Sequence, residues 1–529
     1  MNQDQPLSRR EFVKLLGAVS LSYIAAANHL KTGRGGNPRQ SSEKPNVLML
    51  VFDTLSARHM SLHGYPRATT PNLARFAERA FVYHNHYAAG NFTSPGTASL
   101  LTGVYPWQHR AVNLNGIVSQ TYIDQNIFSL VNASYHTAAY THNPLAALFL
   151  NQFAEHIDQY HAMRELSLAG EVYSDRVGKS QFPVAFWSET MLRGTDHFLP
   201  ASLLVSTLEK GIQNLRVRGI ESSLREKYPR GIPYNYKGMH LLLEDAMDWI
   251  REQVLAYPQP YLAYYHLWPP HDPYLPSADY IDIFNDGMKW PEKAENFFSL
   301  HEPGATINQS RQQYDEYLAY VDFEFGRLVG MLERGGALDN TMLVVTSDHG
   351  ELFERGLLGH LNSTLYQDLL RVPLLISLPK QAGRQDIYTP TSCIDLLPTI
   401  LQVTGEVVPD YIQGEVLPGF GIATRAAEPG VYAMEAKLSS KQDATRTCTL
   451  VMIKDRYKLI RYSGYESELE DELYDIENDP EEMENLANIK RSLSAEMAAE
   501  LEARLEHDLG GLRGGQAYQV RAVAEHTRA

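Results

Sequence analysis

The chain has 529 residues, 44% of them hydrophobic, and a formal net charge of −16. This length exceeds one small core and suits a large domain with a smaller one, while the negative charge argues against a nucleic-acid partner. Two cysteines, Cys393 and Cys448, are too few for a disulfide framework or a Cys-rich zinc site. They could pair with each other, but two buried free thiols are the simpler expectation.

Residues 1–30 have the pattern of a twin-arginine (Tat) export signal. Arg9 and Arg10 precede an apolar stretch, Leu15 to Ala27, that closes with three alanines. Residues 31–44 are predicted to be a flexible linker, and no later stretch is apolar enough to span a bilayer. We therefore expect export by the Tat machinery to the periplasm or cell exterior, unless an uncleaved signal stays as an anchor.

From residue 45 to about 408, predicted strands alternate with predicted helices. Regular alternation indicates an α/β domain in which a large, mostly parallel sheet is wrapped by helices on both faces. Residues 152–237 interrupt the pattern with aromatic segments, which suggests an insertion that acts as a lid or substrate wall, or simply packs against the domain. The predicted strands are 47–52, 138–140, 261–265, 342–345 and 371–376, and the predicted helices are 72–80, 95–101, 240–255, 310–332 and 394–405.

After residue 408 the pattern changes to a smaller α+β domain, residues 409–510. Antiparallel strands are predicted at 430–434, 449–453 and 457–461, with acidic turns between them. A polar helix is expected over 492–509. The tail, 511–529, is predicted to be disordered.

Acids and imidazoles follow three of the buried strands in the main domain. Asp53 ends the first strand, His266 and then His271 follow the strand 261–265, and Asp348 with His349 follow the strand 342–345. Ligands of open α/β sheets bind beyond the carboxyl ends of the strands, so these residues are expected to share one site. Asp53, Asp348 and His349 form a ligand set suited to a divalent cation.

A fourth candidate ligand is Thr93, which stands just before a helix whose start is marked by Pro95. A hydroxyl bound to the metal there would be acidified into a nucleophile, beside helix amides that can hold an oxyanion. The alternative is an ordinary N-cap threonine. His271 and His360 are suited to holding substrate oxygens or to protonating a leaving group.

The motifs that hold these residues resemble those of the sulfatase family of the alkaline-phosphatase superfamily, nearly end to end. The resemblance implies an alkaline-phosphatase-like fold and hydrolysis of a sulfate or phosphate ester at a divalent metal. The matching segments are Asp53-Thr54-Leu55 with His63-Gly64-Tyr65, Thr93-Ser94-Pro95 with Leu100 to Gly103, Pro270 to Tyr274, and Thr346 to Glu351 with Gly359-His360.

The chain departs from the sulfatase pattern at informative positions. Sulfatases have a cysteine or serine that becomes formylglycine where this chain has Thr93, and an arginine where it has Thr97. Thr54 replaces an acid, and His349 replaces an asparagine. Asp, Thr, Asp and His together resemble one metal site of phosphodiesterases and of phosphoethanolamine or phosphoglycerol transferases, in which an unmodified threonine attacks phosphorus.

These features predict an exported hydrolase with one divalent ion, Mn or Zn favoured over Ca or Mg because an imidazole is among the ligands. No complete second set of metal ligands is evident. The substrate would be a small-molecule, glycan or lipid ester of sulfate or phosphate, with phosphoryl transfer to Thr93 slightly favoured. Two alternatives remain: a phosphoethanolamine- or phosphoglycerol-type transferase, and a catalytically silent binder of a glycan or lipid head group, suggested by the missing arginine.

Overall fold

The computed structural model describes residues 44–168, 215, 218–421, 430–439, 446–467 and 469–510. The predicted signal, nearly all of the linker 31–44, much of the insertion 152–237 and the tail 511–529 lie outside the described residues. Within the described ranges, no helix combines the length and hydropathy that a membrane crossing requires.

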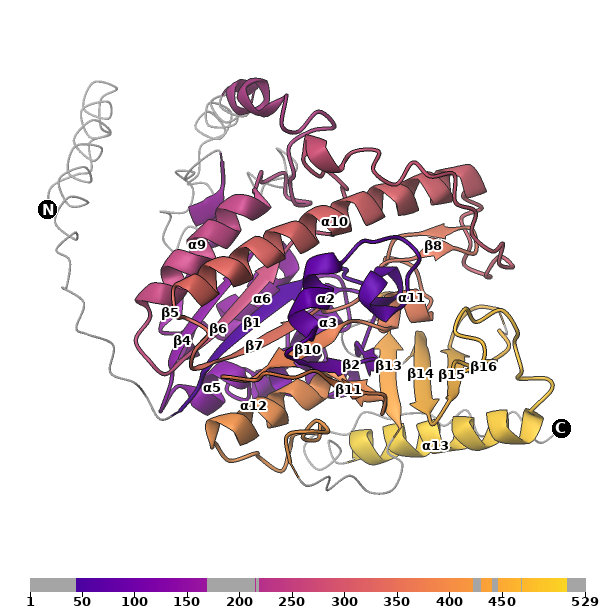
Figure 1. The fold of residues 1–529 in the computed structure, drawn as a ribbon. Coiled ribbons are helices and arrows are strands. Elements are labelled where there is room, and N and C mark those ends of the chain that lie inside the picture. Colours follow the sequence, from indigo (N-terminus) through magenta and orange to yellow (C-terminus); the bar gives the residue numbers. More distant parts are fainter. Residues whose placement is uncertain are drawn as a thin grey trace, which may run out of the picture. The chain divides into compact units, whose positions relative to one another are not determined.

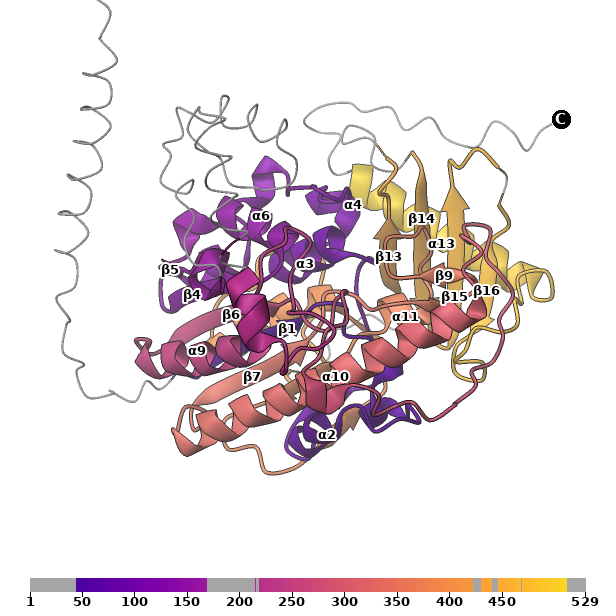
Figure 2. The same cartoon turned by 90° about the horizontal axis from the view of Figure 1, so that it is seen from above.

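An eight-stranded sheet forms the centre of the main domain (Figures 1 and 2). Neighbouring strands are parallel except where β10 takes part, because β10 runs against both β7 and β2. The mostly parallel sheet predicted from the sequence is therefore confirmed. In order across the sheet, the strands are β11 (Gln385–Ile387), β2 (Phe81–Tyr83), β10 (Leu374–Ser377), β7 (Thr341–Thr346), β1 (Asn46–Phe52), β6 (Tyr261–Leu267), β4 (His136–Thr141) and β5 (Gln159–Tyr160).

The strand β10 runs against β7, so the chain re-enters the sheet from the end at which β7 left it. Between β7 and β10 the chain forms the hairpin β8 (Phe353–Glu354) and β9 (Leu357–Leu358) and the short helix α11 (Gln367–Leu370). The outermost short pair, β3 (His86–Tyr87) with β12 (Thr391–Ser392), lies outside this sheet.

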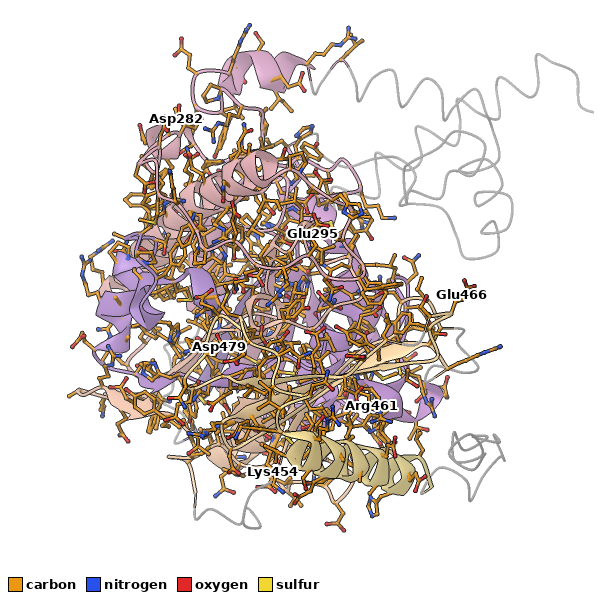
Figure 3. All side chains as sticks on the ribbon, turned by 90° about the vertical axis from the view of Figure 1, so that its right-hand side faces the viewer. Asp282, Glu295, Lys454, Arg461, Glu466 and Asp479 are labelled. Carbon is orange, nitrogen blue, oxygen red and sulfur yellow. The ribbon has the colours of Figure 1, made fainter. Side chains whose placement is uncertain are left out.

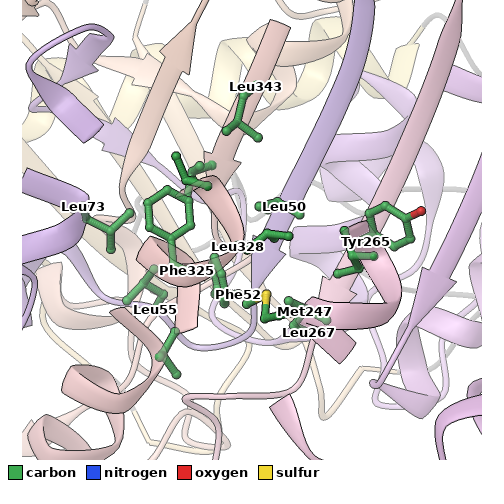
Figure 4. Close-up of a cluster of buried hydrophobic side chains, with 14 of the residues drawn as sticks. Leu50, Phe52, Leu55, Leu73, Met247, Tyr265, Leu267, Phe325, Leu328 and Leu343 are labelled. Carbon is green, nitrogen blue, oxygen red and sulfur yellow. The ribbon is translucent and has the colours of Figure 1, made fainter. Parts of the chain in front are cut away.

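The central strand β1 is buried on both faces. Its even-numbered residues, Leu48 to Phe52, pack with α2, α9 and α10, whereas its odd-numbered residues, Val47 to Val51, pack with α3, α5, α6 and α12. Figure 4 shows the first cluster, with Phe325 near Leu50 and Phe52. The helices are α2 (Pro71–Ala77), α3 (Thr93–Thr102), α4 (Pro106–His109), α5 (Ile127–Val131), α6 (Pro144–Gln152), α9 (Leu243–Ala256), α10 (Gly304–Arg334) and α12 (Leu396–Thr404). Apolar runs without alternation are typical of strands covered on both sides.

Two helix starts differ from the predictions, each for its own reason. The helix expected from residue 240 begins at Leu243, because His240 pairs with Tyr234 in an isolated β-bridge. The helix α10 begins at Gly304 rather than at residue 310, through a polar first turn that has no apolar period. The helix α12 ends as predicted at Gly405, which has the left-handed φ of 75°.

The C-terminal residues form a second, antiparallel sheet, β13 (Val431–Glu435), β14 (Cys448–Lys454), β15 (Tyr457–Ser463) and β16 (Glu472–Asp475). The helix α13 (Arg491–Gly510) runs along it, and Lys454 and Arg461, labelled in Figure 3, pair with α13 residues Glu500 and Glu502.

Cys393 and Cys448 are both buried and free, so the option that they pair is wrong.

The small sheet is joined to the main domain at the loop that leads into α3. The Met434 amide of β13 donates to the Ala89 carbonyl at 2.9 Å. Nearby, the Lys437 amino group donates to Asn91 Oδ1 at 2.9 Å and lies over the Phe92 ring. A shared core, with Trp107 on one side and Tyr432 on the other, continues this contact. The loop before Thr93 is therefore held from both domains.

A prediction about stability arises from Asp322 of α10, which caps α2 from outside. Its carboxylate accepts the amides of Asn72 and Leu73, each at 2.8 Å, while the N-cap residue Thr70 supplies no side-chain bond. We expect Asp322→Ala to lower the free energy of unfolding by about 2 kcal/mol, because two amides of a buried helix end lose their acceptor. Denaturant titration measures this loss. Glu333 also lies on α10, and Glu333→Ala, which breaks its exposed pair with Arg79, is the control. An equal loss in both variants would contradict the prediction.

Candidate active site

Three neighbouring strands bring acids and imidazoles to one edge of the sheet. Val51 of β1 lies opposite His266 on β6 and Thr346 on β7, so the ends of these strands are level. Asp53 and Asp348 follow two residues beyond this level, and His349 comes next. His349 Nε2 lies 3.4 Å from Asp53 Oδ1 and 3.7 Å from Asp348 Oδ2. The three predicted metal ligands from the strands thus lie together, and all are fully buried.

The structure places Thr93 beside this cluster. The side-chain amide of Asn143 donates both to Thr93 Oγ1, at 2.9 Å, and to Asp53 Oδ2. Thr93 is the first residue of α3 rather than the residue before it, and the N-cap Phe92 makes no capping bond. The hydroxyl therefore does not serve as an N-cap.

Asn143 and Thr97 were not predicted as residues of the site, and His266 was expected there without an assigned role. Asn143 follows β4 and caps α6 ahead of Pro144, a pattern that the rule for strand ends could have identified. His266 was recognised as a strand end, and its Nε2 lies 3.5 Å from Asp53 Oδ2 and 3.6 Å from Asp348 Oδ2. Thr97, one turn after Thr93, donates to Asp348 Oδ2 at 3.3 Å. The threonine at the arginine position therefore contacts a predicted ligand.

A prediction arises from the close approach of α3 to Asp348. A Cβ added at Gly96 would lie 2.2 Å from the Asp348 carbonyl oxygen, so only glycine fits between them. We expect Gly96→Ala to displace α3 and to lower kcat/KM about 100-fold, with a stability loss of about 2 kcal/mol from overpacking. Steady-state kinetics and thermal unfolding measure both. Gly304→Ala, at a helix start with open space around it, is the matched control, and wild-type kinetics in Gly96→Ala would refute the expectation.

The two buried carboxyls are electrostatically unequal. Burial alone would raise the pKa of Asp53, but the imidazoles of His271, His266 and His349 outweigh it and hold the pKa well below its usual value. Burial and the charge of Asp53 raise the pKa of Asp348. Two carboxylates this close repel each other, so the site gains from a positive group between them.

The residues present fit a bound cation. Asp53 Oδ1 and His349 Nε2 are buried and have no hydrogen-bond partner among the described residues. Two ligands at about 2.1 Å from one ion lie about 3.0 to 3.5 Å apart, close to the 3.4 Å between these two atoms. Asp53, Asp348 and His349 can therefore hold one metal ion. Thr93 is linked to Asp53 through the Asn143 amide.

His271 and His360 lie next to each other beside the metal cluster. Their ring centroids are 4.7 Å apart, and the His360 ring lies 4.6 Å from that of His349. Burial lowers the pKa of His271, but Asp53 and Asp272 outweigh burial and raise the pKa to about 10. Burial and the charges of His349 and His271 lower the pKa of His360 well below its usual value. One imidazole is thus a charged donor and the other is neutral.

A mostly parallel sheet with a polar cluster at its carboxyl edge, next to a smaller antiparallel sheet, defines an alkaline-phosphatase-like architecture. The family model described as Sulfatase matches residues 45–406, and the model N-sulphoglucosamine sulphohydrolase, C-terminal, matches residues 360–509. Because the first match spans more than half of the chain, this protein belongs to the sulfatase family. The resemblance is confirmed, and with it the class of enzymes that hydrolyse esters.

Known proteins agree with this assignment. The chain is 25% identical over 465 residues to an uncharacterized sulfatase, YidJ, of Escherichia coli, covering 84% of this chain and 83% of the relative. It is 25% identical over 476 residues to a choline-sulfatase of Rhizobium meliloti, covering 85% and 83%. A phosphonate monoester hydrolase of Agrobacterium radiobacter shares the fold, with a TM-score of 0.63, 18% identity and coverage of 87% and 96%.

Proposed function

We propose that this protein is an exported, metal-dependent hydrolase that cleaves a sulfate or phosphate mono- or diester through Thr93, with phosphoryl substrates favoured. The observation that carries the proposal is the amide of Asn143, which bonds both the Thr93 hydroxyl and the Asp53 carboxylate. A nucleophile and a ligand from distant parts of the chain are thereby fixed side by side.

The predicted cofactor is one divalent ion, Mn or Zn favoured, held by Asp53, Thr93, Asp348 and His349. Such an ion, when bound, acidifies a coordinated hydroxyl and offsets the charge of an anionic ester. Asn143 orients the hydroxyl, and the amides of the first turn of α3 are suited to hold the charge that gathers on the ester oxygens. His271, charged, is suited to hold one of these oxygens.

The reaction has two steps in this proposal. Thr93 Oγ gives its proton to solvent and attacks phosphorus, the bond from phosphorus to the leaving oxygen breaks, and that oxygen receives a proton from the His271 and His360 pair. Water then attacks the phosphothreonine, the bond from phosphorus to Thr93 Oγ breaks, and a proton of the water restores the hydroxyl. A monoester substrate yields phosphate, and a diester yields a phosphate monoester. If an alcohol takes the place of water, the same site performs the transferase reaction.

Phosphorus is favoured over sulfur because Thr93 carries a methyl group where sulfatases form an aldehyde, so an unmodified hydroxyl must attack directly. The imidazole of His349 in the ligand set is the second reason, since it matches the phosphodiesterase-type site. The phosphonate monoester hydrolase of similar fold is compatible with this preference.

An assay with four nitrophenyl substrates tests the proposal: a sulfate, a phosphate monoester, a phosphodiester and a phosphonate monoester. We expect turnover of at least one phosphorus ester, with slower turnover of the sulfate. Turnover of the sulfate alone would reverse the preference. A purified protein without bound metal and without turnover of any substrate would instead support the silent binder.

Export is proposed from the pattern at residues 9–27. We expect the double substitution Arg9→Lys and Arg10→Lys to retain the protein in the cytoplasm, because the twin arginines are the recognised feature of a Tat signal. Cell fractionation and immunoblotting measure the distribution. Lys31→Arg, in the linker, is the control. Periplasmic protein in the twin-lysine variant would contradict Tat export.

A further inference from the structure

The hairpin after the metal ligands places Glu351 opposite His360. In this hairpin Phe353 pairs with Leu358 and Glu354 with Leu357, and the Gly359 amide donates to the Leu352 carbonyl at 2.9 Å. In this register Leu352 stands opposite Gly359, and the next pair along the hairpin is Glu351 with His360. The eight residues between them in the sequence therefore form the hairpin.

The side chains of this pair are in direct contact. His360 Nδ1 lies 2.9 Å from Glu351 Oε1, and the Glu351 side chain is completely buried. Gly359, with a φ of 77°, makes the turn that returns the chain toward Glu351. A buried carboxyl at hydrogen-bond distance from one ring nitrogen fixes the orientation of the imidazole.

The contact leaves His360 Nε2 as the ring nitrogen that can face a substrate. Among the described residues, Nε2 has no hydrogen-bond partner, whereas Nδ1 is taken. His271 is held in the same way, since its Nδ1 lies 2.8 Å from the carbonyl of Asp272 and 3.0 Å from its carboxylate. Both imidazoles at the site thus have a second residue that holds Nδ1 and leaves Nε2 available.

We propose that Glu351 is the positioning residue for His360, and that it holds the ring so that Nε2 meets the oxygen of the leaving group. This inference rests on the proposed function, because it assigns the leaving-group proton to His360. In the reaction, the bond from phosphorus to the leaving oxygen breaks and that oxygen takes the proton from Nε2. A neutral His360 carries its one ring proton on Nε2 when Glu351 Oε1 holds the proton shared with Nδ1. As Nε2 gives its proton to the leaving oxygen, the shared proton passes from Oε1 to Nδ1.

Two phosphodiesters with the same phosphoryl group and different leaving groups test the role. A nitrophenolate leaves without help, whereas an alkyl alkoxide needs a proton, and positioned acids contribute about 100-fold or more. We expect Glu351→Ala to lower kcat for the alkyl ester about 100-fold and for the nitrophenyl ester less than about 5-fold. Equal losses for both esters would overturn the assignment to the leaving group.

A double-variant comparison tests whether the two residues act together. His360→Ala and the double variant with Glu351→Ala should have the same kcat for the alkyl ester, because Glu351 acts through His360. Glu351→Gln, whose amide can still pair with Nδ1, should recover most of the activity. A double variant clearly slower than His360→Ala would show that Glu351 acts elsewhere.

Histidine ¹⁵N NMR tests the contact without any turnover. We expect Glu351→Ala to change the Nδ1 and Nε2 shifts of His360, assigned with His360→Ala, and Glu351→Gln to retain a bonded Nδ1. Glu295→Ala is the control, because Glu295 and His301 form a similar pair, 2.6 Å apart, that is exposed. Unchanged His360 shifts in Glu351→Ala overturn the inference, and changed shifts in a protein without esterase activity overturn only the proposed function.

Discussion

Replacing Thr93 with valine is expected to lower kcat/KM for the preferred ester by about 10⁵-fold, a loss typical of removing a catalytic nucleophile. Valine keeps the branched shape at the start of α3 and removes only the hydroxyl that Asn143 holds at 2.9 Å. Thr93→Ser keeps the hydroxyl and should retain turnover within about tenfold. Steady-state kinetics with the substrate identified by the ester panel measure both values.

The control for this prediction lies in the same helix. Thr102 is buried, and its hydroxyl donates only to the Ala98 carbonyl at 2.6 Å, so Thr102→Val should leave turnover unchanged. Intact mass of the protein quenched during turnover gives a second measurement, since phosphothreonine adds the mass of one phosphoryl group. Thr93→Val with more than about a tenth of the wild-type rate would exclude Thr93 as the nucleophile.

Removal of the divalent ion is expected to abolish activity and to lower the thermal midpoint. Asp53 and Asp348 would hold the ion, and their carboxylates repel each other when it is absent. At 100 times its Kd a bound ligand stabilises the fold by about 2.7 kcal/mol. Chelation followed by Mn²⁺ or Zn²⁺ should restore both properties. Binding should weaken as pH falls, because the neighbouring carboxylates Asp348 and Asp53 overcome the effect of burial and raise the pKa of His349, so that protons compete with the ion for Nε2.

Substitutions locate the ion. Asp53→Asn and Asp348→Asn should each reduce the metal content measured by elemental analysis to near zero, because each removes one charged ligand. Asp386→Asn is the control, since Asp386 pairs with His84 and Arg384 at the edge strand β11. Full metal content in either ligand variant would place the ion elsewhere.

The sequence predicts the parts of this fold that follow from local pattern. Runs such as Met342 to Val345 indicate buried strands, and the rule that acids follow strand ends brings together Asp53, Asp348 and His349. Asn143 also follows a strand end, but its contact with Thr93, fifty positions earlier, depends on how α3 and α6 pack and has no local pattern. The polar first turn of α10 has no apolar period, so the start of that helix is predicted late.

The bond between β13 and the Ala89 carbonyl has a consequence for how this enzyme can be divided. A fragment that ends near residue 408 would lack the Met434 amide and the Lys437 amino group, and the segment before Thr93 would lose these supports. Shortened or chimeric versions must therefore carry their own small sheet. The C-terminal region helps to hold the chain that leads to the proposed nucleophile.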